Sequence, residues 1–420
     1  MRRTDRTYEA AGFEELEPRL FLDGDVTVTL AGHTLKITGD GLDNVIAVNN
    51  VDPDEFEVVG LDGTAVNGGG SLTQGDAWKG VKIDLKGGNN RVYFNGVEVN
   101  GNVSIKTGSG DDFVDVDPGL LRGNLTIDTG SGYDRVDVES DEEDATIEGN
   151  LSIKSSSKAG PGLLGARAGE EITLDGGSQE TEINVYEVLV LGKLDIKGGA
   201  GHDGVYVDDC TIIGVTHINT CGEDDYVELG SELESGNVFV AAVFVNMGNG
   251  SYEGDELAIN HSAFGSPVDI KMGKGVLMDD KGPGGGYVGN NVNIMDSAFN
   301  SSFTLKTGGG DDDIEIRFDG GRTFMTDQLG NAFGGLVNID TGGGDDEFGV
   351  YGDEVEGDIY INGDVKLDMG SGDDDLYADY VTAKAGVVDG GKGYDRGAAS
   401  NIISDDPLWV IRNFEEEIAP

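Results

Sequence analysis

A short acidic turn, Thr-Gly-x-Gly-Asp-Asp, recurs along the chain and constrains its fold more than any other feature. Full copies stand at 107–112, 307–312 and 341–346, and a shorter Gly-Ser-Gly-Asp-Asp stands at 370–374. Alternating apolar residues flank each copy, as Val103 and Ile105 do before the first one. Such alternation indicates half-buried strands, and glycines between strands indicate turns. The unit is therefore a strand, the acidic turn, a second strand and a looser corner.

The spacing of these turns predicts a solenoid. The second turn glycine recurs every 22 residues through Gly88, Gly110 and Gly132, and later intervals include 25, 28, 34 and 35 residues. A period near 22 with insertions suits one coil of a parallel β-helix, whereas an array of β-sandwiches gives no cause for a near-identical turn at every other strand junction. We therefore expect an all-β, single-stranded parallel β-helix (β-solenoid), right-handed, with about 13–15 coils of roughly 22–35 residues and terminal caps. At about 4.8 Å per coil, the rod would be about 70 Å long.

The same pattern predicts three segments. Residues 1–25 form an N-terminal segment and cap, residues 26–400 the repeat domain, and residues 401–420 a C-terminal cap that contains an apolar cluster around Trp409. Terminal repeats of a solenoid need such caps because their apolar faces are otherwise open. Cys210 and Cys221 are eleven residues apart. They are expected to be isolated thiols, since a disulfide would need a tightly folded corner.

Composition excludes several classes of partner. The chain has 80 acidic and 28 basic residues, a formal net charge of −52, so a nucleic acid or an anionic membrane surface is disfavoured. The 71 glycines follow no period of three, which excludes collagen. The Asp residues sit beside Val and Ile rather than in an acidic tail, which argues against disorder. No apolar stretch predicts a membrane span or an ordinary cleavable signal peptide.

One N-terminal run resembles a known export element. Leu16-Glu17-Pro18-Arg19-Leu20-Phe21-Leu22 is similar to the LEPR-XLL motif of large exported bacterial surface proteins, with Phe21 where that family more often has Leu. The resemblance covers about a dozen residues and implies an extracellular or cell-surface location. Independently of it, Leu20 and Leu22 could cap the open apolar end of the solenoid.

The acidic turn also partly resembles the RTX-type calcium repeat, Gly-Gly-x-Gly-x-Asp-x-U-x. That resemblance, together with the preference of Ca²⁺ for carboxylate and carbonyl oxygens, predicts calcium at stacked turns. RTX repeats run in tandem every nine residues, whereas this turn occurs once per coil, so an ion between facing turns is not implied. The alternative is that the Asp side chains cap their own turns. The candidate metal ligands are Asp111, Asp112, Asp134, Asp224, Asp225, Asp311, Asp312, Asp345, Asp346, Asp373, Asp374 and Asp395.

Two classes of function follow. The first is a non-enzymatic, exported, acidic β-solenoid with a cell-surface, adhesion or matrix role, a monomer whose partners are surface or matrix components such as polysaccharide. The second is a β-helix enzyme, a lyase or hydrolase acting on an acidic polysaccharide. Its loose basic candidates are Lys271, Lys274, Arg317 and Arg322, and its groove would lie near residues 279–300 and 319–335. The four histidines form no triad, and His202 is interpreted as a turn residue, so we expect a scaffold rather than an enzyme.

Overall fold

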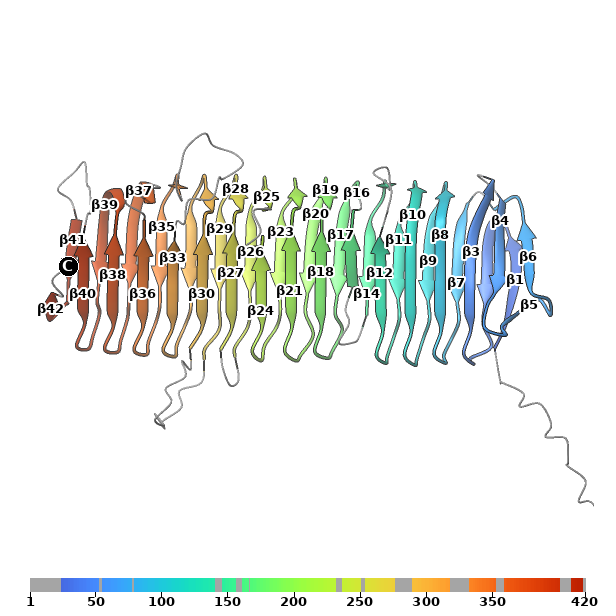
Figure 1. The fold of residues 1–420 in the computed structure, drawn as a ribbon, viewed down its shortest axis with the longest axis horizontal. Coiled ribbons are helices and arrows are strands. Elements are labelled where there is room, and N and C mark those ends of the chain that lie inside the picture. The colour runs from blue at the N-terminus through green and yellow to red at the C-terminus, as the bar shows by residue number, and fades with distance from the viewer. Residues whose placement is uncertain are drawn as a thin grey trace, which may run out of the picture.

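The computed structural model describes residues 24–52, 55–77, 79–139, 146–155, 161–165, 167–231, 236–250, 254–275, 289–317, 332–352, 359–400 and 409–417. Every regular element among these residues is a β-strand, and none is a helix. The strands stack as successive coils of a straight rod, with the N-terminal coils at one end and the C-terminal coils at the other (Figure 1). The expected all-β solenoid is confirmed. The LEPR-like run lies outside the described residues, as does most of the two segments expected to form a groove.

Two long parallel ladders run the length of the rod. The first ladder contains β2 (Thr34–Thr38), β7 (Gly80–Asp84), β9 (Asn102–Lys106), β11 (Leu125–Asp128), β14 (Leu151–Lys154), β17 (Glu171–Asp175), β20 (Lys193–Lys197), β23 (Thr216–Asn219), β26 (Val243–Asn246), β29 (Val268–Lys271), β32 (Phe303–Lys306), β35 (Val337–Asp340), β37 (Ile359–Asp368), β39 (Val381–Asp389) and β41 (Trp409–Arg412). The second ladder contains β3 (Val45–Asp52), β8 (Arg91–Val99), β10 (Phe113–Leu121), β12 (Arg135–Glu139), β15 (Pro161–Leu164), β18 (Glu182–Tyr186), β21 (Gly204–Asp208), β24 (Tyr226–Leu229), β27 (Glu256–Asn260), β30 (Asn291–Met295), β33 (Asp313–Arg317), β36 (Glu347–Tyr351), β38 (Asp375–Asp379), β40 (Arg396–Ser400) and β42 (Glu416–Glu417).

A third ladder of short strands closes each coil. It begins at the ends of β8 and β10 and continues through β13 (Thr146–Ile147), β16 (Arg167–Ala168), β19 (Leu189–Val190), β22 (Thr211–Ile212), β25 (Val238–Phe239), β28 (Ala263–Phe264), β31 (Ala298–Phe299) and β34 (Ala332–Phe333) to the starts of β37 and β39. The acidic turn joins each first-ladder strand to the second-ladder strand of the same coil. The register confirms the period, because Val103 pairs with Leu125, 22 residues later.

The N-terminal end departs from this pattern. There, β1 (Asp25–Ala31) pairs with β2 in antiparallel fashion, and β4 (Glu55–Gly60) lies antiparallel to both β3 and β6 (Ser71–Gln74). The short β5 (Ala65–Val66) pairs in parallel with β1. Of these added strands, β4, β5 and β6 account for the long interval of 46 residues between Thr34 and its ladder partner Gly80. They place strands beside the first coil, where the parallel ladders begin.

The core is a set of apolar columns parallel to the rod axis. In the first ladder, Val103, Leu125 and Leu151 occupy one column and are at most 1% exposed. In the third ladder, four phenylalanines follow one another, with neighbouring ring centroids 4.8–5.0 Å apart and ring planes within 4° of parallel: Phe239, Phe264, Phe299 and Phe333. The ring spacing matches the distance between hydrogen-bonded strands, so each ring packs on its counterpart in the next coil. Because apolar burial is the main favourable term in folding, the alternation seen in the sequence largely determines this core.

Candidate functional site

The acidic turns superimpose from coil to coil, and glycine is what allows it. Gly310 and Gly344 have φ of +121° and +140°, a region that other residues rarely adopt. A Cβ placed on Gly344 would lie 2.0 Å from the carbonyl oxygen of Gly310 in the preceding coil. The backbones are therefore too close for any side chain. This close approach places the two residues that follow each glycine in two parallel columns.

The inner column consists of the second acidic or amide residue of each turn and is buried. Its members are Asn44, Asn90, Asp112, Asp134, Asp203, Asp225, Asp255, Asn290, Asp312, Asp346, Asp374 and Asp395, each at most 2% exposed. The Oδ1 atom of Asp346 accepts the backbone N–H of Asp312 in the preceding coil at 2.9 Å, and Asp374 accepts that of Asp346 at 2.9 Å. The same bond recurs along the column at 2.6–3.1 Å. These bonds therefore link neighbouring coils from Asn44 to Asp134 and from Asp203 to Asp395.

The outer column consists of the residue immediately before each inner one, and its hydrogen bonds point in the opposite direction along the rod. The backbone N–H of Asp345 donates to Asp311 Oδ1 in the preceding coil, and that of Asp373 donates to Asp345 Oδ1, both at 2.9 Å. The first copies do the same, since Tyr133 N–H donates to Asp111 Oδ1 at 2.9 Å. These carboxylates are exposed or half-buried. A turn with two aspartates thus uses one side chain to accept from the coil before it and the other to accept from the coil after it.

The candidate metal ligands divide between these columns. Asp112, Asp134, Asp225, Asp312, Asp346, Asp374 and Asp395 are inner, and Asp111, Asp224, Asp311, Asp345 and Asp373 are outer. Asp311 and Asp345 stack in adjacent coils as expected. Asp111 and Asp134 are also in adjacent coils but occupy different columns. Among the described residues, no three or more His, Cys, Asp or Glu side chains gather as metal ligands would, and calcium stays a prediction.

Sequence reasoning missed five inner members. Asn44, Asn90 and Asn290 are amides, while Asp203 and Asp255 follow degenerate turns such as Gly201-His202-Asp203. A positional rule would have found them, because each directly precedes the first residue of the second-ladder strand in its coil. His202 occupies the outer position of its turn, and its Nδ1 lies 2.9 Å from the carbonyl oxygen of Asp224. Its interpretation as a turn residue is therefore consistent with its contacts.

Burial changes the protonation of the inner carboxyls. It is the largest cause of their raised pKa values: about 6 for Asp112, Asp255 and Asp312, about 7 for Asp203 and Asp374, and about 8 for Asp225 and Asp346. Like charge in the adjacent coils adds to this effect on Asp346, and the hydrogen bond from the backbone N–H of Asp312 opposes it. At neutral pH the pKa values of Asp225 and Asp346 favour the protonated form.

The asparagines of the inner column show where such a proton would point. The amide nitrogen of Asn90 donates to the carbonyl oxygens of Gly88 and Thr107, and that of Asn290 donates to Thr307 O at 2.7 Å. The corresponding atoms of Asp374 and Asp395, Oδ2, are buried and accept no hydrogen bond. A protonated carboxyl would present a donor in the place of the amide N–H. The positions of Asp374 and Asp395 therefore suit a neutral side chain, whether Asn or protonated Asp. At Asp134 and Asp203, by contrast, Oδ2 accepts a hydrogen bond, from the Thr129 hydroxyl and the Gly199 N–H respectively.

Other groups considered for chemistry are held in local contacts. Lys271 Nζ lies 3.6 Å from Asp269, and Arg317 Nε lies 2.5 Å from Glu315, both on their own strands. Cys210 is buried and Cys221 exposed, and both are free thiols, which confirms the expectation of isolated thiols. Arg322 and most of the expected groove lie outside the described residues.

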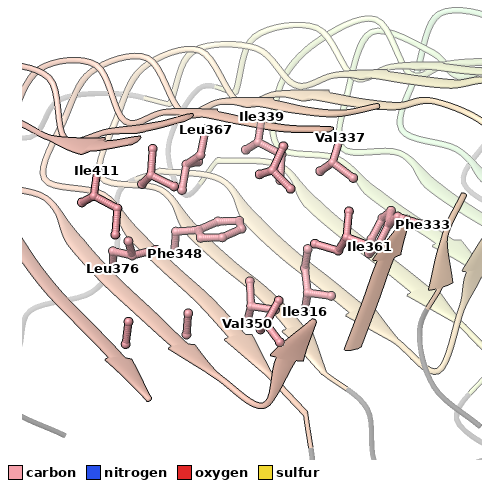
Figure 2. A pocket seen from close by; sticks show the side chains of 15 residues that line it. Ile316, Phe333, Val337, Ile339, Phe348, Val350, Ile361, Leu367, Leu376 and Ile411 are labelled. Carbon is pink, nitrogen blue, oxygen red and sulfur yellow. The ribbon is translucent and has the colours of Figure 1, made fainter. Parts of the chain in front are cut away.

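The C-terminal coils contain a cavity of about 340 Å³ inside the core. Its lining comes from all three ladders and includes Phe333, Phe348, Leu367 and Leu376 (Figure 2). All of its lining residues are apolar, so it offers no group for catalysis.

Among the described residues, no helix has the length and apolarity needed to cross a membrane. In comparisons with known proteins, the chain matches no protein-family model, no curated protein and no solved structure.

Proposed function

We propose that the protein is a non-enzymatic, exported, acidic scaffold that acts at the cell surface in adhesion or matrix assembly. The observation that carries the proposal is the use of the recurrent acidic turn: its carboxylates hold neighbouring coils in register through backbone hydrogen bonds. A motif whose side chains serve to hold the coils in register is expected of a rigid spacer. The partners that suit such a rod are surface or matrix components. They include polysaccharides that can bind a protein with a net charge of −52.

Export is the second part of the proposal and rests on the resemblance of residues 16–22 to the LEPR-XLL motif. Cell fractionation of the full chain and of a chain lacking residues 1–23 tests it. We expect the full chain outside the cell and the shortened chain inside. Equal distribution of the two chains would contradict the export role of this segment.

Calcium is the third part, and the outer column is the place proposed for it. Asp311, Asp345 and Asp373 lie in consecutive coils and are exposed or half-buried, whereas the inner carboxyls are buried and favour protons. Repulsion between like charges about 5 Å apart, about 3 kcal/mol at an effective dielectric of 20, would be relieved by a divalent cation. Carboxylates that approach in this way are ligands suited to Ca²⁺.

The scaffold and the polysaccharide-degrading enzyme predict different results with the same samples. Purified full-length protein would be incubated with acidic polysaccharides, with and without calcium. A scaffold binds in a pull-down assay and leaves chain length unchanged. New reducing ends, or the ultraviolet absorbance of unsaturated uronates, would instead favour the enzyme.

A further inference from the structure

The side chains that fill the core become smaller in the last coils. In the third ladder, the column of four phenylalanines that ends at Phe333 continues with Ile361 and then Ala383. In the second ladder, Val350 is followed by Ala378 and then Ala399. Each of these changes removes volume from the same interior. The cavity of about 340 Å³ lies where the two series coincide.

The cavity is elongated along the rod. On the second ladder its lining includes Ile316, Val350, Ala378 and Ala399, one residue from each of four successive coils. Four coils span about 14 Å at the spacing of hydrogen-bonded strands. Figure 2 shows the labelled lining side chains spread over several neighbouring strands, from Phe333 and Val337 to Ile411.

The channel reaches the surface in the last described coil. Ile411 lines it and is 56% exposed. Phe348 and Leu376 are 5% and 7% exposed, whereas the equivalent positions of the middle coils, such as Leu257 and Val292, are fully buried. Among the described residues, the apolar lining is therefore most exposed at this end, which is where a ligand would enter.

We infer that this channel binds the hydrocarbon tail of a single-chain amphiphile, with its head group outside, next to Ile411. An elongated cavity with only apolar lining holds no ordered water and favours an apolar guest. No polar lining residue is available to bind a head group inside. Outside, Arg412 is paired with Asp389 at 2.6 Å, and the chain carries a net charge of −52, so a neutral or cationic head group is favoured over an anionic one.

Calorimetric titration of the full chain with three ten-carbon probes, all below their micelle concentrations, tests this inference. The probes are decyl maltoside, decyltrimethylammonium and decanoate. We expect the neutral and cationic probes to bind with one molecule per chain, at least tenfold more tightly than decanoate. Absence of binding by all three probes would overturn the inference. This is the result expected if part of the chain itself fills the channel. Equal affinity for decanoate would overturn the assignment of the head group.

Two filling variants locate the binding. Ala378→Leu and Ala399→Leu each add carbon atoms to the channel wall, so each should weaken decyl maltoside binding at least tenfold and raise the melting temperature. Ala258→Leu is the matched control, because Ala258 lies on the outer face of a middle coil, between Glu228 and Asn293. Binding retained by both filling variants, with circular dichroism showing native strands, would overturn the channel as the site.

Discussion

The inner and outer columns of the acidic turn contain the same residue type one position apart, yet their surroundings are opposite. Asp346 is buried and accepts a hydrogen bond from the preceding coil, whereas its neighbour Asp345 is exposed and accepts one from the following coil. Burial raises the pKa of Asp346 to about 8. Two adjacent aspartates thus divide between structure and surface charge. Chemistry inferred from an Asp-Asp pair therefore depends on which of the two faces solvent.

The largest expected effect comes from removing the glycine that holds both columns. Gly344→Ala should lower the free energy of unfolding by about 3 kcal/mol or more, because its Cβ would meet the Gly310 carbonyl oxygen and its φ of +140° strains alanine. Guanidinium denaturation measures this. Gly75→Ala is the control, since a Cβ there meets nothing within 4 Å. Equal stability of the two variants would mean that the coils do not stack as closely as described.

The next effect separates the columns by hydrogen bonding. At pH 4.5, Asp346→Ala should cost about 2 kcal/mol of unfolding free energy, because the buried N–H of Asp312 loses its acceptor. Asp345→Ala should cost less than about 0.5 kcal/mol, because water can replace an exposed carboxylate. Denaturation of both variants under identical conditions gives the difference. An outer variant as unstable as the inner one would remove the distinction between the columns.

The pH dependence of stability tests the protonation of the inner column. The folded pKa of Asp346, about 8, is above its ordinary value of 3.8, so the folded state holds this proton more tightly than the unfolded state. The contribution to stability is fully present below pH 4 and is lost as pH rises from about 4 to 8.

Asp346→Asn removes this proton and its pH dependence. The wild type should lose stability relative to the variant by up to about 1.4 kcal/mol per pH unit between pH 4 and 8, and the two should be nearly equal at pH 4. Melting curves across this range measure the difference, with Asp345→Asn, which keeps the Asp346 carboxyl, as the matched control. A wild type whose stability rises between pH 4 and 8 in parallel with that of Asp346→Asn would show that Asp346 is ionised in the folded state.

The smallest effect concerns calcium. Ca²⁺ at ten times its dissociation constant would add about 1.4 kcal/mol to the stability of the wild type. Replacement of Asp311, Asp345 and Asp373 together by Asn should abolish this gain, whereas Asp346→Asn should retain it. Thermal melting with calcium or chelator measures both. Melting temperatures that do not change with calcium would make the calcium prediction wrong. Loss of the calcium-dependent gain only in Asp346→Asn would place the ion in the inner column.

Much of the fold was predictable because it depends on local pattern. The spacing of Gly88, Gly110 and Gly132 indicated the period, and the ladder register follows it. Even the degenerate turn that ends at Asp225 lies in phase, since Asp225 Oδ1 accepts the N–H of Asp203 one coil earlier. The antiparallel strands β4 and β6 were not predicted, because alternation alone does not distinguish a hairpin from a coil.

The candidate site was predictable in residue type and not in role. Asp345 and Asp346 are the same residue type at adjacent positions. Only the direction of each Cβ at the turn decides which of them is buried. Asn90 and Asn290 belong to the inner column although the motif is acidic, since an amide fits the same contacts. These roles depend on the adjacent coil, which a motif search does not include.

The sequence by itself determined a stack of coils, because alternating apolar residues and glycine turns at a regular spacing have one arrangement that buries the former and superimposes the latter. The tertiary structure decided which carboxyl of each pair is buried and where the core is left unfilled. Burial raises pKa values only once a neighbouring coil excludes water. The channel likewise exists only where Phe333, Ile361 and Ala399, from different coils, face the same space.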